Sequence, residues 1–219
     1  MISRIILYFY ILLSLCLTLS LASPSSAFFG ARFEPPDGKI YHGAQAEVRP
    51  TGFFSYHVDW DGIEDYTKAC DNRPKLIMHY ISFDPIAFWL LKPTIFKISR
   101  KPHDYILQIG LDFYSYTPRF DILNPKDITA GIAQGRYDKR IRKLAQLFIK
   151  MGVPIFLRPG YEFGGNGQGQ HASKQHWVMA WKKIFTIFEN EGAENVAFVG
   201  NILDTRDYME YYPGDEYVD

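Results

Sequence analysis

The chain has 219 residues, of which 47% are hydrophobic and 16% aromatic, and its 24 basic side chains equal its 24 acidic ones. This composition is globular and excludes a disordered chain, a collagen-like chain and a highly charged nucleic-acid-binding chain. A chain without net charge has no electrostatic reason to bind an anionic polymer or an anionic membrane surface, whereas a neutral sugar polymer is compatible with it.

The first 27 residues have the layout of a secretory signal peptide. Arg4 precedes an apolar run over residues 5–21, and small residues follow it. Cleavage after Ala22 or Ala27 leaves 197 or 192 of the 219 residues, so we expect one secreted domain over residues 28–219. The alternative is an uncleaved membrane anchor, because the run is about the minimum length for a span.

The two cysteines predict no intrachain disulfide. Cys16 lies in the predicted signal peptide and Cys70 then remains alone. We expect Cys70 to be a half-buried small hydrophobic residue rather than a nucleophile. The fold must therefore be stabilised by its hydrophobic core.

Short apolar runs that alternate with longer segments predict a parallel sheet within an α/β fold. The runs are Ile40–Ala44, Lys75–Ser82, Tyr105–Leu111, Pro154–Arg158 and Asn195–Asn201. They are apolar on both faces, as strands covered by helices are. Between the second and third runs, Asp84-Pro85 has the pattern of a helix start, with proline at the first helical position.

Two segments have the hydrophobic period of an amphipathic helix. Apolar side chains recur at helical spacing over residues 137–151, and Gly152 supplies the stop. The second helix carries its apolar residues over 177–188, between a predicted N-cap at Ser173 and a terminator at Gly192. Because the helical period alone accounts for their aromatic residues, we expect these to be core residues.

The strongest candidate site follows the fourth apolar run. Arg158, Gly160 and Glu162 have the same parity, so they face the same way if the extended geometry persists, and a glycine-rich loop opens at residues 164–169. A carboxylate at a strand end suits general acid catalysis, and we expect partial burial of Glu162 beside Tyr161. The alternative is a structural ion pair between Arg158 and Glu162.

Polar side chains at the other strand ends would lie on the same rim if the sheet belongs to a barrel. His79 is either a contact for a sugar hydroxyl or a satisfied core histidine. Asp112 is either a pocket carboxylate or a loop cap. Asn201 either donates to a substrate or positions a catalytic acid.

Other chemistries find little support in the sequence. There is no HExxH, CxxC or GxSxG motif, and His171 and His176 do not share a helical face. The glycine-rich loop lacks the lysine of a phosphate-binding loop. We therefore expect no metal, no cofactor and no nucleic-acid partner.

The segment Arg158-Pro-Gly-Tyr-Glu-Phe-Gly-Gly resembles glycoside hydrolase family 26, the β-mannanase family. The similarity continues through residues 177–181, 195–201 and 211–219, and weakly back to about Tyr41. The resemblance implies a (β/α)8 barrel that hydrolyses β-linked plant polysaccharides, mannan or mixed-linkage glucan, with retention.

The resemblance also implies roles for individual residues. Glu162 matches the acid/base glutamate that follows the fourth strand, and Arg158 matches the arginine that supports it. Beside these we predict a set of substrate-binding candidates around the same rim. They are Arg158, Tyr161, His79, Asp112 and Asn201.

The sequence departs from the family in three places. Tyr161 stands where many mannanases have histidine, and Gly200 stands where tryptophan is frequent. The family nucleophile is a glutamate after the seventh strand, whereas a sixth strand is expected only from about Asp219. We therefore expect an incomplete barrel of about five βα units plus the start of a sixth strand, truncated at the C-terminus and inactive alone. Asp112 and Asp204 are the only other carboxylates at predicted strand ends.

Two alternatives to a catalytic chain follow from these departures. The chain is either a non-catalytic glycan-binding remnant that uses Tyr161, Tyr211 and Tyr212, or a truncated product that does not fold stably. The second alternative arises because an open barrel leaves edge strands unpaired.

Overall fold

The computed structural model describes residues 31–45, 48–50, 56–58, 60–83, 105–115, 126–162, 173–201 and 208–219. The chain divides into two compact units, Met1–Ile40 and Tyr41–Asp219. In the first unit, residues 31–40 contain no helix or strand, and the Lys39 amide donates to the Pro36 carbonyl at 2.9 Å. The predicted signal peptide and the predicted helix start at Asp84-Pro85 lie outside the described residues.

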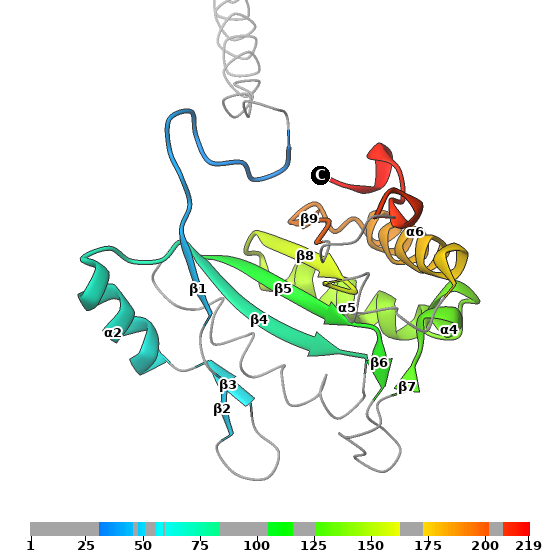
Figure 1. Cartoon of the computed structure of the whole chain (residues 1–219), viewed down its shortest axis with the longest axis horizontal. Helices are drawn as coiled ribbons and strands as arrows, with labels where there is room; N and C mark the ends of the chain where they lie inside the picture. Colours follow the sequence, from blue (N-terminus) through cyan, green and yellow to red (C-terminus); the bar gives the residue numbers. More distant parts are fainter. Residues whose placement is uncertain are drawn as a thin grey trace, which may run out of the picture. The chain divides into compact units, whose positions relative to one another are not determined.

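The second unit is built around a sheet of five parallel strands (Figure 1). The strands are β1 (Gly43–Gln45), β4 (Leu76–Ser82), β5 (Ile106–Asp112), β8 (Ile155–Pro159) and β9 (Val196–Phe198). Their spatial order, β1-β4-β5-β8-β9, follows their order in the sequence. Each connection therefore advances by one strand in the same direction, as in the βα units of a barrel. Each strand overlaps one of the five apolar runs, and the parallel α/β fold is confirmed. The described strands form an open sheet, an incomplete barrel.

The remaining elements are helices and two short antiparallel ribbons. The α-helices are α2 (Trp60–Cys70), α4 (Thr129–Ala133), α5 (Asp138–Met151) and α6 (Lys174–Glu191), followed by the 3-10 helices η1 (Tyr208–Tyr211) and η2 (Asp215–Tyr217). The ribbons pair β2 (Val48–Pro50) with β3 (Tyr56–Val58), and β6 (Tyr114–Ser115) with β7 (Lys126–Asp127). The apolar runs did not predict these ribbons, because two- and three-residue strands carry too little pattern.

The two predicted helices have the ends that the sequence indicates. Gly152 ends α5 in the left-handed conformation, with φ of 64°. The Ser173 hydroxyl accepts from the His176 amide at 3.2 Å and so caps α6. Gly192 ends α6, again left-handed, with φ of 76°. Side-chain capping and left-handed glycines satisfy backbone groups that the helix leaves unbonded, so these predictions are confirmed.

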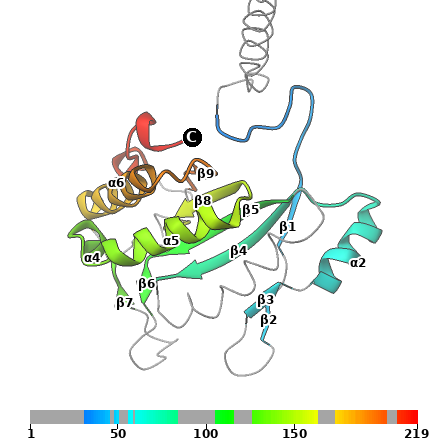
Figure 2. The ribbon, with the colours of Figure 1, turned by 180° about the vertical axis from the view of Figure 1, so that it is seen from behind.

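Helices α5 and α6 cover one face of the sheet, which both views show (Figures 1 and 2). The aromatic residues of α6 lie in this core: Trp181 and Phe188 are each 1% exposed, and both rings contact Phe198 of β9. Their role as core residues is confirmed. Among the described residues, no helix has both the length and the apolarity needed to cross a membrane.

Side-chain alternation gives the sheet two different faces. The face under the helices is fully apolar apart from His79. Its buried residues include Ile77, His79, Ile81, Leu107, Ile109, Leu111, Ile155, Leu157, Val196 and Phe198. The other face, called the open face below, is less buried along most of its length. It carries Met78, Tyr80, Gln108, Gly110, Phe156 and Arg158.

Two details concern the edges of this unit. Asp219 lies against β9: its amide donates to the Phe198 carbonyl at 2.9 Å, and its carboxylate accepts from the Phe198 amide at 2.8 Å. Cys70 is exposed at the end of α2, so the expectation of a half-buried side chain is wrong. The reason is that α2 buries only Ile63.

Gly160 connects β8 to the residues that follow it and requires the absence of a side chain. Its φ is 51°, and a Cβ atom there would lie 2.2 Å from Cη2 of Trp177 and 3.0 Å from Cδ2 of Phe113. Its amide donates to the Leu111 carbonyl at 2.7 Å. The chain leaving β8 is therefore pressed against α6 at a point where only glycine fits.

We expect Gly160→Ala to destabilise the fold far more than Gly152→Ala. Both positions have positive φ, so both variants lose roughly 1 kcal/mol of unfolding free energy to backbone strain. At Gly152 a Cβ meets nothing within 4 Å, whereas at Gly160 it overlaps Trp177, which adds about 2 kcal/mol or more. Urea denaturation measures both losses. Equal losses would contradict the packing described for Gly160.

Candidate active site

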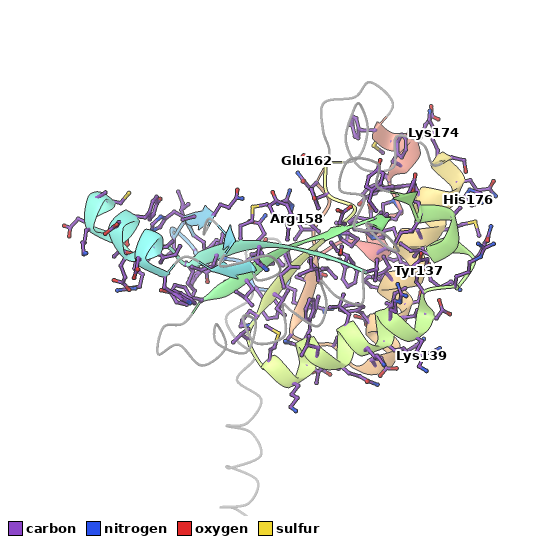
Figure 3. The ribbon with its side chains drawn as sticks, turned by 90° about the horizontal axis from the view of Figure 1, so that it is seen from below. Tyr137, Lys139, Arg158, Glu162, Lys174 and His176 are labelled. Carbon is purple, nitrogen blue, oxygen red and sulfur yellow. The ribbon has the colours of Figure 1, made fainter. Side chains whose placement is uncertain are left out.

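The candidate site lies where β8 and β9 end, at the carboxyl edge of the sheet. Arg158 is the fourth residue of β8, and Tyr161 and Glu162 follow within four residues. Asn201 comes three residues after β9, the neighbouring strand. Figure 3 labels Arg158, which lies in β8, and Glu162, which lies just after that strand. The carboxyl edge is where parallel barrels place their active sites.

Asn201 joins Arg158 to Glu162. Its Oδ1 atom accepts a hydrogen bond from Nη2 of Arg158 and a second one, at 3.1 Å, from the Glu162 amide. Among the ion pairs that the described residues form with one another, none joins Arg158 to Glu162. The two residues are thus linked through a neutral amide, and the alternative of a structural ion pair is not what the structure shows.

Arg158 is a buried cation, 6% exposed. Nη1 contacts the sulfur of Met78 at 3.5 Å, and the guanidinium lies 5.7 Å from the ring centroid of Tyr161. Within the described part of the chain, Nε has no hydrogen-bond partner. None of the ion pairs among the described residues includes Arg158, so its buried charge is held by the Asn201 oxygen, the Met78 sulfur and the Tyr161 ring.

Tyr161 and Tyr80 form an aromatic pair over the open face. Their ring centroids are 4.7 Å apart and the rings are tilted by 55°. Gly110 lies beneath them, because a Cβ there would come within 2.6 Å of the Tyr80 ring and 2.8 Å of the Tyr161 ring. The register sets Tyr80, Gly110 and Arg158 side by side on three neighbouring strands. An aromatic pair at this separation is stabilised beyond the apolar area that it buries.

The phenol of Tyr161 remains protonated at neutral pH. Burial is the main cause that raises its pKa above the usual range, and the negative charge of Asp112 adds to it. A neutral hydroxyl both donates and accepts hydrogen bonds, which is what recognition of a sugar hydroxyl requires.

Glu162 is exposed, so the expected partial burial is wrong. The expectation that Arg158, Gly160 and Glu162 face the same way is also wrong, because the extended geometry ends at Pro159. Gly160 and Glu162 both have positive φ, of 51° and 56°. For a residue with a Cβ atom the left-handed conformation costs roughly 1–2 kcal/mol, and such residues persist where surrounding contacts hold them, often at functional sites.

Asp112 is the loop cap that was considered for it, and its role as a pocket carboxylate stays a prediction. It is 5% exposed, and its Oδ1 accepts from the Tyr114 amide at 2.9 Å, which caps the turn after β5. Its charge also raises the pKa of Tyr161, so the carboxylate lies near the aromatic pair. Its parity is that of Gly110, on the open face.

His79 lies on the opposite face from Arg158 and Tyr80. It is paired in register with Ile109, is 3% exposed, and belongs to the face under the helices. The structure therefore does not bring His79 together with the other candidates. Neither ring nitrogen has a hydrogen-bond partner among the described residues, so His79 is a core residue but not a satisfied one. Burial lowers its pKa to about 4.

The sequence analysis singled out neither the contact of Tyr80 with Tyr161 nor the need for Gly110. Both could have been found from strand register, because Tyr80 has the parity opposite to His79. The glycine-rich loop over residues 164–169, His171 and Asp204 lie outside the described residues.

Comparison with known proteins supports the same fold. No family model matches the chain. Endoglucanase H from Acetivibrio thermocellus is 32% identical over 103 residues, which cover 42% of this chain and 11% of that protein. A ruminal endo-β-1,4-mannanase of glycoside hydrolase family 26 superimposes with a TM-score of 0.62 at 21% identity, covering 83% of this chain and 44% of the mannanase. A Bacillus subtilis mannanase superimposes with a TM-score of 0.55 at 16% identity, covering 82% and 61%.

These similarities show that the chain shares an α/β fold of the barrel class with these mannanases. Within that class, the resemblance to family 26 rests on the Arg158–Gly165 motif and on the shared fold of the mannanases. The chain spans 11% of the endoglucanase and less than two thirds of each of these two mannanases. The roles of Glu162 and the substrate-binding candidates stay predictions.

We expect His79 to make the fold less stable in acid. Because burial lowers the folded-state pKa to about 4 from 6.5, the unfolded chain binds the proton first as the pH falls through 6.5. His79 therefore removes about 3 kcal/mol of unfolding free energy between pH 7 and pH 4. The His79→Leu variant has no group that titrates at this position, so it should lose about 3 kcal/mol less unfolding free energy than the wild type between pH 7 and pH 4. Urea denaturation at the two pH values measures the difference. An identical pH dependence in both proteins would contradict the burial of a neutral histidine.

Proposed function

We propose that the chain supplies the acid/base part of a secreted, retaining endo-β-glycosidase that acts on a β-1,4-linked plant polysaccharide, mannan or mixed-linkage glucan. The observation that carries the proposal is the arrangement around Glu162. Its exposed carboxyl group follows β8 directly, at the carboxyl edge of a parallel sheet, and its backbone is held in the left-handed conformation beside a buried arginine.

The chemistry assigned to Glu162 is proton transfer to the glycosidic oxygen. A retaining glycosidase first protonates the leaving oxygen and then uses the same residue as a base to activate water. Glu162 is accessible to a substrate, and the Tyr161 hydroxyl, kept neutral, is available to a sugar hydroxyl beside it. The tilted pair of Tyr80 and Tyr161 offers an apolar surface to the sugar ring.

The second carboxylate of a retaining mechanism must lie roughly 5 Å from the first. We assign no residue of this sequence to that role. Asp112 has a structural hydrogen bond to the Tyr114 amide and lies on β5 rather than on the strand that carries the family nucleophile.

The substrate class rests on what the similar proteins are named for. The similar structures include mannanases of family 26 and a Prevotella bryantii endo-β-mannanase/endo-β-glucanase, which superimposes with a TM-score of 0.58 at 17% identity and is covered to 32%. Endoglucanase H adds a glucan-degrading relative over 103 residues. Both mannan and mixed-linkage glucan are therefore substrates to test, and secretion through the predicted signal peptide suits a polymer outside the cell.

Glu162→Gln should strongly slow hydrolysis of polysaccharide in the natural protein that contains these residues. Removing a general acid lowers kcat by about 100- to 10,000-fold on mannan or mixed-linkage glucan. An aryl glycoside whose leaving group needs no proton should still release its aryl group at a near wild-type rate in the first turnover. Glu194→Gln is the matched control, because Glu194 is exposed and precedes β9, at the opposite edge of the sheet.

Full hydrolysis of polysaccharide by Glu162→Gln would contradict the acid role. If the wild-type protein binds manno- or cello-oligosaccharides in isothermal titration but hydrolyses nothing, the glycan-binding alternative holds. Tyr211 and Tyr212 argue against that alternative, because both make contacts within the protein. Tyr211 packs edge-on against Trp177, and the Tyr212 hydroxyl donates to Asp215 at 2.8 Å.

A further inference from the structure

We infer that Asn201 is a positioning residue, which fixes the Glu162 turn and couples it to Arg158, rather than a residue that binds substrate through its carbonyl. The inference rests on the proposed function, since it concerns the residue proposed as the acid. It assigns Asn201 a role through hydrogen bonds to two other members of the site.

The sheet brings Asn201 to the Glu162 turn. Strand β9 pairs in parallel with β8 through Phe156–Ala197 and Leu157–Phe198. The Val199 amide continues the ladder by donating to the Leu157 carbonyl at 2.8 Å. As β8 runs on into its turn, the chain beyond β9 runs beside it, and Asn201 reaches the Glu162 amide.

The carbonyl oxygen of Asn201 is fully used. An amide oxygen has two lone pairs, and here Nη2 of Arg158 and the Glu162 amide each take one. Two donors on one oxygen also fix the orientation of the amide. An oxygen in this state has no lone pair left for a sugar hydroxyl, so any donation to a substrate would have to come from the Nδ2 group instead.

The bond to the Glu162 amide matters because of the backbone conformation there. Glu162 is exposed and has a φ of 56°, a conformation that a residue with a Cβ atom adopts only when something holds it. Among the described residues, Asn201 makes the one hydrogen bond that reaches Glu162. The direction in which the Glu162 side chain leaves the backbone therefore depends on Asn201, and a misdirected acid loses rate rather than affinity.

The bond to Arg158 makes the three residues one unit. Arg158 is buried, and Asn201 provides its one oxygen acceptor within the described part of the chain. A hydrogen bond to a charged donor is stronger than one between neutral groups. Arg158, anchored in β8, thus holds the Asn201 amide in place, and the amide in turn holds the turn that carries Glu162.

The test compares Asn201→Ala with Asn201→Asp in the natural protein that contains these residues. The first readout is amide hydrogen exchange of Glu162 by NMR, which needs no activity. Asn201→Ala should accelerate exchange of that amide by about tenfold. Asn201→Asp keeps an acceptor oxygen and should retain most of the protection.

Asn195→Ala is the matched control. Asn195 precedes the same strand, and its Nδ2 donates to the Phe148 and Val153 carbonyls at 2.9 and 2.8 Å. Its loss should lower the melting temperature without changing exchange at Glu162. If Asn195→Ala accelerates that exchange as much as Asn201→Ala does, or if Asn201→Ala leaves it unchanged, the inference is overturned.

The second readout is kinetic. On polysaccharide, Asn201→Ala should lower kcat at least tenfold with KM within about twofold, and Asn201→Asp should recover part of the loss. A raised KM with unchanged kcat would mean that Asn201 binds substrate, and the inference would be wrong. If the wild-type protein hydrolyses nothing, the proposed function fails, while the exchange measurement still decides whether Asn201 holds Glu162.

Discussion

The structure depends on the parallel register of β4, β5, β8 and β9. Because side chains alternate between faces, this one register decides both the core and the site. One parity sends Ile109, Leu157 and Phe198 under helices α5 and α6. The other places Tyr80, Gly110 and Arg158 in one row on the open face. A shift of one residue in any pairing would exchange core residues for site residues on that strand.

At the carboxyl edge of the sheet the extended conformation of β8 ends, and the chain that follows packs closely against α6. Gly160 turns the chain against Trp177 where no side chain fits, and Glu162 follows in a strained conformation. The strained residue of this turn is Glu162, because glycine adopts a positive φ without a steric penalty. The sheet thus supports the turn that carries Glu162 through Arg158 of β8 and through Asn201, which follows the neighbouring strand β9. This is how a carboxylate on an exposed turn can be held in a defined direction.

The sequence predicts the elements that have a hydrophobic pattern or characteristic residues at their ends. Buried parallel strands are continuously apolar, so all five runs were found, and α6 was bounded correctly by Ser173 and Gly192. The alternation of side chains along the strands, by contrast, did not identify the site residues. His79 and Tyr80 are adjacent, and only the register shows that Tyr80 faces the site and His79 the core. The parity of Glu162 was not informative either, because positive φ at Gly160 ends the extended geometry.

We propose above all that Glu162 stands at the glycosidic bond, with the sugar ring beside Tyr161 and Tyr80. The most direct measurement is a crystal structure of the natural protein, carrying Glu162→Gln, with a bound manno- or cello-oligosaccharide. We expect the side-chain amide of residue 162 to lie within about 3 Å of a glycosidic oxygen, the distance that proton transfer requires. A sugar bound at another surface, or a glycosidic oxygen beyond the reach of residue 162, would contradict it.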